Sequence, residues 1–199
     1  MISVIGDVHG SVGELIDLVA QVPEDVETII QVGDLGAFPH LPWKSNPLPR
    51  PVHFIRGNHD YEPDIAHLTT PTEIMHNLIF VPSGWVEEID GRLVGFLGGA
   101  DSVDMPDRTE GKDWWYTERI TGAQVTQLGQ MGKLDLMITH TPPISVVVAM
   151  FGRPGTISDM YVQQAWEAAG MPPLVCGHMH KSVKYHQVRV LDEWELAFV

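Results

Sequence analysis

The sequence predicts an α/β fold, and three observations lead to this prediction. Short apolar runs, rich in β-branched residues, alternate with a segment of helical periodicity in the N-terminal part of the chain. Nearly all of these runs give way to glycine or a turn that carries Asp, Asn or His. The middle of the chain then changes to β character. Loops at the carboxyl ends of strands converge in open α/β sheets, so this order predicts a sheet with a polar site at one edge.

Each apolar run of this kind is expected to form a strand. The run Thr28-Ile29-Ile30 is β-branched, and Asp90-Gly91 is a typical two-residue hairpin turn between two runs. The predicted strands cover residues 1–5, 26–32, 52–55, 78–81, 85–89, 93–97, 134–139, 174–176, 182–190 and 193–199.

Three helices are expected from helical periodicity and from capping residues. Ser11 with Glu14 predicts a capping box at the start of the first helix, and Thr121 with Gln124 predicts another at the start of the second. Ser158 is expected to cap the third helix, which glycine and proline end. The predicted helices cover residues 11–22, a segment from 121 onwards, and 158–169.

Two segments lack a regular pattern. Residues 39–51 contain five prolines and are expected to form a semi-rigid surface loop. Residues 98–118 form an irregular insert that carries Trp114-Trp115-Tyr116, a sequence that suits either a substrate-facing lid or a packed flap. We expect one domain over residues 1–199, with the proline-rich loop and the insert near its active site.

The composition limits the class of protein. A hydrophobic content of 44% and a charged content of 19% are ordinary for a folded globular protein. A net charge of −14 argues against a broad basic face for an extended nucleic-acid duplex, but divalent cations would still allow a small phosphorylated substrate. The single cysteine, Cys176, suits a reducing compartment. With no visible signal peptide and no membrane-spanning run, the expected location is the cytoplasm, without a membrane partner.

Seven side chains of metal-ligand type lie in five short clusters, nearly all after an apolar run. Two are carboxylates, one is an amide and four are imidazoles, a mixture that suits Mn, Fe or Zn better than Mg or Ca. A bridging carboxylate with neutral nitrogen and oxygen ligands is what a pair of metal ions needs. The seven residues are Asp7, His9, Asp34, Asn58, His140, His178 and His180.

These clusters resemble the ordered motifs of the calcineurin-like metallophosphoesterase superfamily, and the stretch from Gly98-Gly99-Ala100 to Trp114-Trp115 resembles its small bacterial and phage members. The motifs are Asp7-Val8-His9, Gly33-Asp34, Gly57-Asn58-His59-Asp60, Thr139-His140 and Gly177-His178-Met179-His180. The resemblance implies a four-layer α/β/β/α sandwich of two mixed β-sheets flanked by helices, with a dimetal site at the sheet rim. It also leaves open that the chain is phage-encoded and acts in the host cytoplasm.

The same resemblance implies a role for each cluster. The implied ligands are Asp7, His9 and His180 for one ion, Asn58, His140 and His178 for the other, and Asp34 as the bridge. His59 would be a general acid outside the coordination shell, and Asp60 beside it fits a supporting catalytic role. The two divalent or trivalent ions would be Mn before Fe, Zn, Ni or Co, and a metal-bridging hydroxide would attack phosphorus.

The chain departs from the protein Ser/Thr phosphatases at Ala37 and Phe38, where that branch carries an Asp-Arg pair that grips phosphate. The phosphate-gripping group is therefore open, and Arg56, Arg108 and Trp114 are the candidate substrate-binding residues. Arg119 and Arg153 are further candidate cations.

The expected function is hydrolysis of phosphate esters, monoesters before diesters. Expected substrates are a phosphorylated small molecule, a nucleotide or a phosphoprotein, and the oligomeric state is open. One alternative is a phosphodiesterase or nuclease that acts on nucleotides or nucleic-acid ends, which would need more cations than the sequence offers. The alternative from another class is a non-catalytic scaffold with this fold, against which a complete ligand set and His59 argue.

Overall fold

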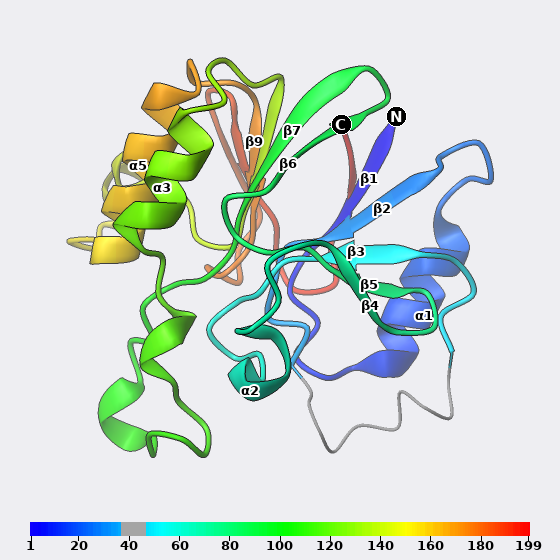
Figure 1. The fold of residues 1–199 in the computed structure, drawn as a ribbon, viewed down its shortest axis with the longest axis horizontal. Helices are drawn as coiled ribbons and strands as arrows, with labels where there is room; N and C mark the ends of the chain where they lie inside the picture. Colours follow the sequence, from blue (N-terminus) through cyan, green and yellow to red (C-terminus); the bar gives the residue numbers. More distant parts are fainter. Residues whose placement is uncertain (37–46) are drawn as a thin grey trace.

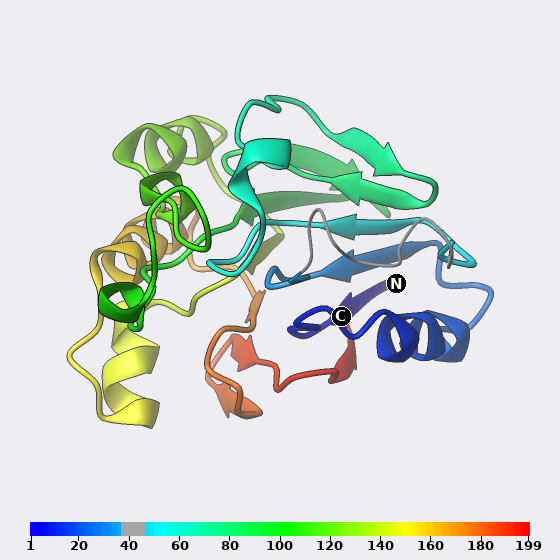
Figure 2. The same cartoon turned by 90° about the horizontal axis from the view of Figure 1, so that it is seen from below.

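Two mixed six-stranded sheets pack face to face with helices on both outer sides (Figure 1), which confirms the predicted sandwich. The structure is a computed structural model, and it describes residues 1–36 and 47–199. Viewed from below (Figure 2), helix α1 lies on one side of the paired sheets, and helices α3 and α5 lie on the other.

In the first sheet, β1, β2, β3 and β5 run parallel and an antiparallel strand closes each edge. In order across the sheet, the strands are β12 (Leu196–Phe198), β1 (Ile2–Ile5), β2 (Thr28–Gln31), β3 (Val52–Phe54), β5 (Leu78–Phe80) and β4 (Thr72–Met75).

The second sheet repeats this plan, with four parallel strands between two antiparallel edges. Its strands are β10 (Val183–Tyr185), β11 (Val188–Val190), β9 (Leu174–Cys176), β8 (Leu136–Thr139), β7 (Arg92–Leu97) and β6 (Val86–Ile89). The hairpin turn at Asp90-Gly91 is confirmed, because both residues have the positive φ angles, 51° and 71°, that such a turn needs.

Three apolar clusters hold the layers together. Neighbouring residues of one strand serve different clusters, because successive side chains point to opposite faces of a sheet. Ile29 packs against α1 on the outside, whereas Ile30 packs between the two sheets. Covered on both faces, the central strands are continuous apolar runs, which is why the sequence marks them so clearly.

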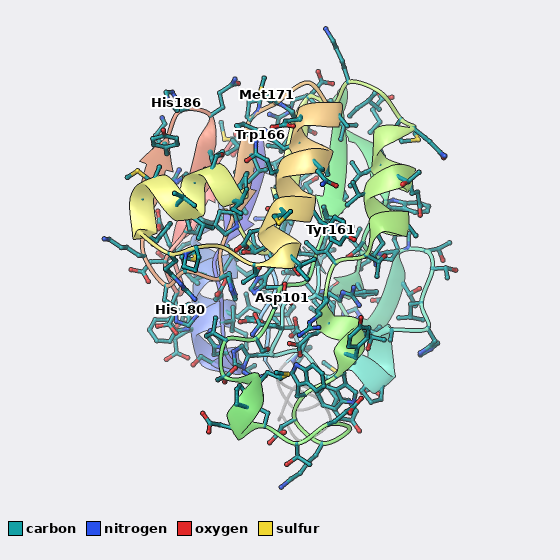
Figure 3. All side chains as sticks on the ribbon, turned by 90° about the vertical axis from the view of Figure 1, so that its left-hand side faces the viewer. Asp101, Tyr161, Trp166, Met171, His180 and His186 are labelled. Carbon is teal, nitrogen blue, oxygen red and sulfur yellow. The ribbon has the colours of Figure 1, made fainter. Side chains whose placement is uncertain are left out.

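The helices cover the outer faces. Helix α1 packs on the first sheet, and α3 and α5 pack on the second and against each other. In Figure 3, Tyr161 lies between α5 and α3, and Asp101 lies at the N-terminal end of α5. The bounds of the helices are α1 (Val12–Gln21), α2 (Glu62–Ile65), α3 (Gly122–Gly129), α4 (Ile144–Val146), the π-helical turn η4 (Val147–Phe151) and α5 (Ile157–Ala168).

Two predicted caps are wrong and one is confirmed. Ser11 precedes α1, but its side chain makes no capping hydrogen bond, so the Ser11–Glu14 box does not form. Helix α5 is capped by Thr156, because Ser158 lies in the first turn, fully buried. The box at Thr121 is present as predicted.

The insert contains two short 3₁₀ helices, η2 (Met105–Asp107) and η3 (Tyr116–Glu118), and extends away from both sheets at the lower left of Figure 1. Helices α2, α4 and η4 and strand β4 were not predicted. Of the predicted proline-rich loop, residues 39–46 lie outside the described residues, as do Ala37 and Phe38. In the part of the chain that the structure describes, no helix has the length and apolarity needed to cross a membrane.

Candidate metal centre

The five clusters meet at one rim because each follows the carboxyl end of a parallel strand. In the first sheet, Asp7 and His9 follow β1, Asp34 follows β2 and Asn58 follows β3. In the second sheet, His140 follows β8, and His178 and His180 follow β9. The loops of the two sheets are joined directly, since the backbone amide of His178, after β9, donates to Oδ2 of Asp7, after β1, at 2.9 Å. Both sheets therefore build the site.

Four of the side chains form a first group. Ligand atoms of Asp7, His9, Asp34 and His180 all lie within 4.8 Å of one another. Within the group, Nε2 of His9 lies 2.9 Å from Nε2 of His180, which in turn lies 3.3 Å from Oδ2 of Asp7. Ring nitrogens and carboxylate oxygens directed at a common point are the arrangement that a divalent ion requires.

A second group lies beside the first and shares one member with it. Ligand atoms of Asp34, His140 and His178 also lie within 4.8 Å of one another. Oδ1 of Asn58 lies 3.2 Å from Nε2 of His140, which adds an amide oxygen to the group. Asp34 belongs to both groups, and this is the position that a bridging carboxylate must occupy. The donor set therefore fits two metal ions.

The backbone is strained where it presents these ligands. His9, Asp34, His178 and His180 have φ angles of 47°, 52°, 67° and 45°, in the left-handed region that residues with a Cβ rarely adopt. Such strain persists only where the surroundings enforce it, and it concentrates at functional sites.

Glycines next to the ligands allow the loops to approach closely. A Cβ at Gly57 would lie 2.7 Å from Cγ of Asp34 and nearer still to its Oδ1. A Cβ at Gly177 would lie 3.0 Å from Cγ of Asp7 and 2.8 Å from a methyl group of Val32. Real Cβ atoms do not approach this closely, so both carboxylates occupy space that only glycine leaves free.

The ionisable groups of the site shift one another's pKa values. Burial by itself would raise the pKa of Asp34, but the charge and hydrogen bond of His140 bring it well below its usual range. For His140, burial opposes protonation, yet the Asp34 carboxylate raises its pKa to about 9. Burial and the neighbouring His140 lower the pKa of His178 to about 3. The buried carboxylates thus attract positive charge, which metal ions would supply.

Asp60, a candidate catalytic residue, organises the loops and does not contact the imidazole of His59. Its carboxylate accepts backbone hydrogen bonds from Gly57 at 2.6 Å, Gly36 at 2.9 Å and Asp34 at 3.1 Å. Burial and the charge of Asp34 raise its pKa to about 7, and the donated hydrogen bonds of Gly57 and Gly36 act against this rise. Asp60 therefore ties the loop after β2 to the loop after β3. A supporting role of Asp60 in catalysis stays a prediction.

His59 lies at the edge of the two groups. Its side chain is 37% exposed, and its Nε2 lies 4.0 Å from Oδ2 of Asp34. Nη2 of Arg108 lies 2.6 Å and 2.8 Å from its two ring nitrogens. Burial lowers the pKa of His59, the Asp34 carboxylate opposes this, and the Arg108 charge adds to it. The side chain that contacts the imidazole is therefore a cation from the insert.

Arg108 is held in this position by three further contacts. Its Nε donates to Oδ2 of Asp104 at 2.8 Å, and its Nη1 donates to the carbonyls of Asn58 at 3.2 Å and Asp113 at 3.3 Å. Only 9% of the side chain is exposed. Arg108 is thus a fixed cation at the edge of the site.

The other two candidate substrate contacts are engaged elsewhere. The guanidinium of Arg56 is buried, 3.3 Å from both carboxylate oxygens of Glu62 and 3.0 Å from the carbonyl of Arg119. Trp114 is 8% exposed, and the Arg119 guanidinium lies 5.7 Å from its ring centroid. Both side chains therefore have protein partners at the base of the insert, and their contact with substrate stays a prediction.

Sequence reasoning missed two contributions to the site. Oε1 of Glu193 lies 3.7 Å from Nε2 of His9 and 3.5 Å from Nδ1 of His180. The hydroxyl of Ser102 accepts a hydrogen bond from the side-chain amide nitrogen of Asn58 at 3.1 Å and donates one to Glu118. This contact holds the side-chain amide oxygen of Asn58 toward His140. No motif marks Glu193 or Ser102, because each acts through its position in a turn.

Comparison with known proteins places these features in a family. Among solved structures, the chain is similar to an archaeal phosphodiesterase, with 14% sequence identity and a TM-score of 0.42 over 96% of this chain and 81% of that chain. A search of curated proteins finds no match. The family model of calcineurin-like phosphoesterases matches residues 1–182, a range that contains all seven ligand-type residues and His59. The chain therefore belongs to the calcineurin-like phosphoesterase family.

Proposed function

We propose that this chain hydrolyses phosphate esters, phosphomonoesters before phosphodiesters, with two bound metal ions. Family membership supports the general class, phosphoester hydrolysis. The observation that carries the proposal is that Asp34 belongs to both ligand groups while His59 lies beside them, outside both. A proton donor next to a dimetal site is what cleavage of a phosphate ester needs.

The ligand groups suggest how the ions would be held. Asp7, His9 and His180 would bind one ion, Asn58, His140 and His178 the other, and Asp34 both. Bound there, the ions would lower the pKa of a coordinated water and neutralise charge on the phosphate oxygens. Mn is our first choice because the set mixes imidazoles with oxygen donors, and Fe, Zn, Ni and Co are the alternatives.

His59 supplies the proton for the leaving group. Asp34 accepts a hydrogen bond from the His59 backbone amide at 2.8 Å, which fixes this residue relative to the ligands. The ring is partly exposed, so a bound ester can reach it. When the bond between phosphorus and the leaving oxygen breaks, that oxygen takes the proton from the imidazole.

Arg108 is our choice for the phosphate-gripping cation. Its guanidinium is held at the edge of the site by Asp104 and two carbonyls, so it loses little side-chain freedom on contact with phosphate. The expected substrate is a phosphorylated small molecule, a nucleotide or a phosphoprotein.

The test is hydrolysis of an aryl phosphate monoester and of the matching bis-aryl diester. The protein is first stripped with a chelator and then measured with and without added Mn²⁺. Metal-dependent hydrolysis that favours the monoester supports the proposal, and hydrolysis that favours the diester replaces it with a phosphodiesterase. If neither ester is hydrolysed with any of the five candidate metals, the non-catalytic scaffold is the better description.

A further inference from the structure

A pocket of about 400 Å³ opens beside His59, none of the seven ligand-type residues lines it, and its lining combines aromatic rings with cations. We propose that it is a leaving-group subsite that binds an aromatic ring, such as that of a nucleoside or an aryl alcohol. This inference rests on the proposed phosphoester hydrolysis and adds a substrate class to it. The lining residues on which the argument depends are His59, Tyr61, Arg108, Lys112 and Trp115.

The position of His59 identifies which part of the substrate enters the pocket. The His59 ring lines the pocket and also packs edge-on against the His9 ring, whose centroid is 5.3 Å away, whereas His9 does not line the pocket. Because His59 protonates the leaving oxygen, the phosphoryl group stays on the His9 side. The group bonded to the leaving oxygen then extends past His59 into the pocket.

Two aromatic side chains from separate segments meet in the pocket wall. The rings of Tyr61, from the loop before α2, and Trp115, from the insert, are 5.2 Å apart at an interplanar angle of 86°. Both are partly exposed, in contrast to the neighbouring Trp114, which is buried. Aromatic faces that remain accessible in a pocket bind flat rings by stacking, without selecting one particular base.

The rest of the lining is polar. Arg108 is held by Asp104, and Asp113 accepts a hydrogen bond from the amide of Thr109 at 2.6 Å, so both carboxylates in the pocket are engaged. The exposed Lys112 is a further cation among the lining residues. A leaving group with an aromatic ring and polar substituents fits this lining, and 400 Å³ is within the range of small-molecule sites, about 300–1,000 Å³.

The experiment compares two esters whose leaving groups are both primary alcohols, benzyl phosphate and ethyl phosphate, on the Mn²⁺-loaded full chain. For Trp115→Ala, kcat/KM for benzyl phosphate should fall about tenfold while that for ethyl phosphate stays within about twofold, as expected for the loss of one stacking partner. Trp115→Leu, which keeps an apolar side chain in case the alanine variant does not fold, should give the same pattern. The matched control is Tyr116→Ala, because Tyr116 belongs to the same insert, is 66% exposed and does not line this pocket. This control variant should leave kcat/KM unchanged for both substrates.

Equal losses for the two esters, or no loss for either, would overturn the subsite. Binding of benzylphosphonate and ethylphosphonate, measured by calorimetry, tests it without turnover. The benzyl compound should bind about tenfold more tightly, and Trp115→Ala should remove the difference. If no ester is hydrolysed but the benzyl preference in binding depends on Trp115, the proposed function fails and the subsite stands. If both phosphonates bind equally, the subsite is wrong whatever the activity.

Discussion

Replacement of Gly57 by alanine tests whether the close approach of the loops is what positions Asp34. A Cβ at this residue would lie 2.7 Å from Cγ of Asp34 and nearer still to its Oδ1, so the carboxylate oxygen must move by more than about 1 Å to reach ordinary contact distance. The backbone has little freedom to shift, because the carboxylate of Asp60 accepts hydrogen bonds from the backbone amides of both Gly57 and Asp34. The new methyl group therefore displaces a carboxylate that belongs to both ligand groups.

We expect two measurable effects of Gly57→Ala. Overpacking of this kind costs about 1–3 kcal/mol, and each kcal/mol lowers Tm by roughly 2–4 °C in a chain of this size. The affinity for Mn²⁺ should fall about 10–100-fold, the usual effect of disturbing the support of a metal ligand. Thermal unfolding of the chelated protein measures the first effect, and titration with Mn²⁺ followed by calorimetry measures the second.

Gly13→Ala is the matched control, since Gly13 lies in helix α1 and a Cβ there meets no atom within 4 Å. Alanine is the better helix former, so this variant should be about 0.5–1 kcal/mol more stable and should bind Mn²⁺ normally. If Gly57→Ala has the Tm and the Mn²⁺ affinity of the unaltered chain, the steric account of how Asp34 is positioned is wrong.

Three further predictions concern the ligands and their surroundings. Asp34→Asn should weaken Mn²⁺ binding at least about 10–100-fold, and a variant that still takes up two tightly bound ions would contradict a bridging role. His59→Asn should keep Mn²⁺ binding and lose about 10²–10⁴-fold in kcat on an alkyl phosphate, so near-normal kcat would remove His59 as the acid. Burial raises the pKa of Glu118, so the stability that this carboxyl contributes is present below the unfolded value of 4.5 and is lost as the pH rises through the folded value. Glu118→Gln cannot ionise, and its Tm relative to the unaltered chain, measured without metal, should therefore rise as the pH increases above about 5; a constant difference would mean that folding does not raise the pKa of Glu118.

Much of the fold could be predicted because buried parallel strands have a simple pattern. Residues 28–31 and 136–139 are apolar or β-branched with few exceptions, and glycine or a turn follows each. Capping was less predictable, since Ser11 and Thr156 both carry a suitable hydroxyl but only Thr156 makes the hydrogen bond. Strand β4 was missed because its residues are half exposed at a sheet edge, where apolar periodicity is weak.

In the candidate site, too, some residues could be predicted from the sequence and others could not. The seven ligand-type residues were predictable because each follows a strand, and neighbouring parallel strands bring such residues to one rim. The contact of Arg108 with His59 joins residues 49 positions apart, and it depends on the path of an irregular insert. The proximity of Glu193 to His180 likewise depends on the turn after β11. Long-range contacts made by loops have no periodic pattern, so the sequence alone could not place them.

The distribution of ligands over the two sheets has a mechanical consequence. Each ligand group draws on both, since Asp7, His9 and Asp34 meet His180 from the opposite sheet, and Asp34 meets His140 and His178. A bound ion is therefore a cross-link between the two halves of the sandwich, and neither half could separate from the other without releasing it. At an ion concentration 100 times its Kd, such a tie adds about 2.7 kcal/mol to the free energy of unfolding. Metal supply would then control how long the chain survives proteolysis as well as whether its site is complete.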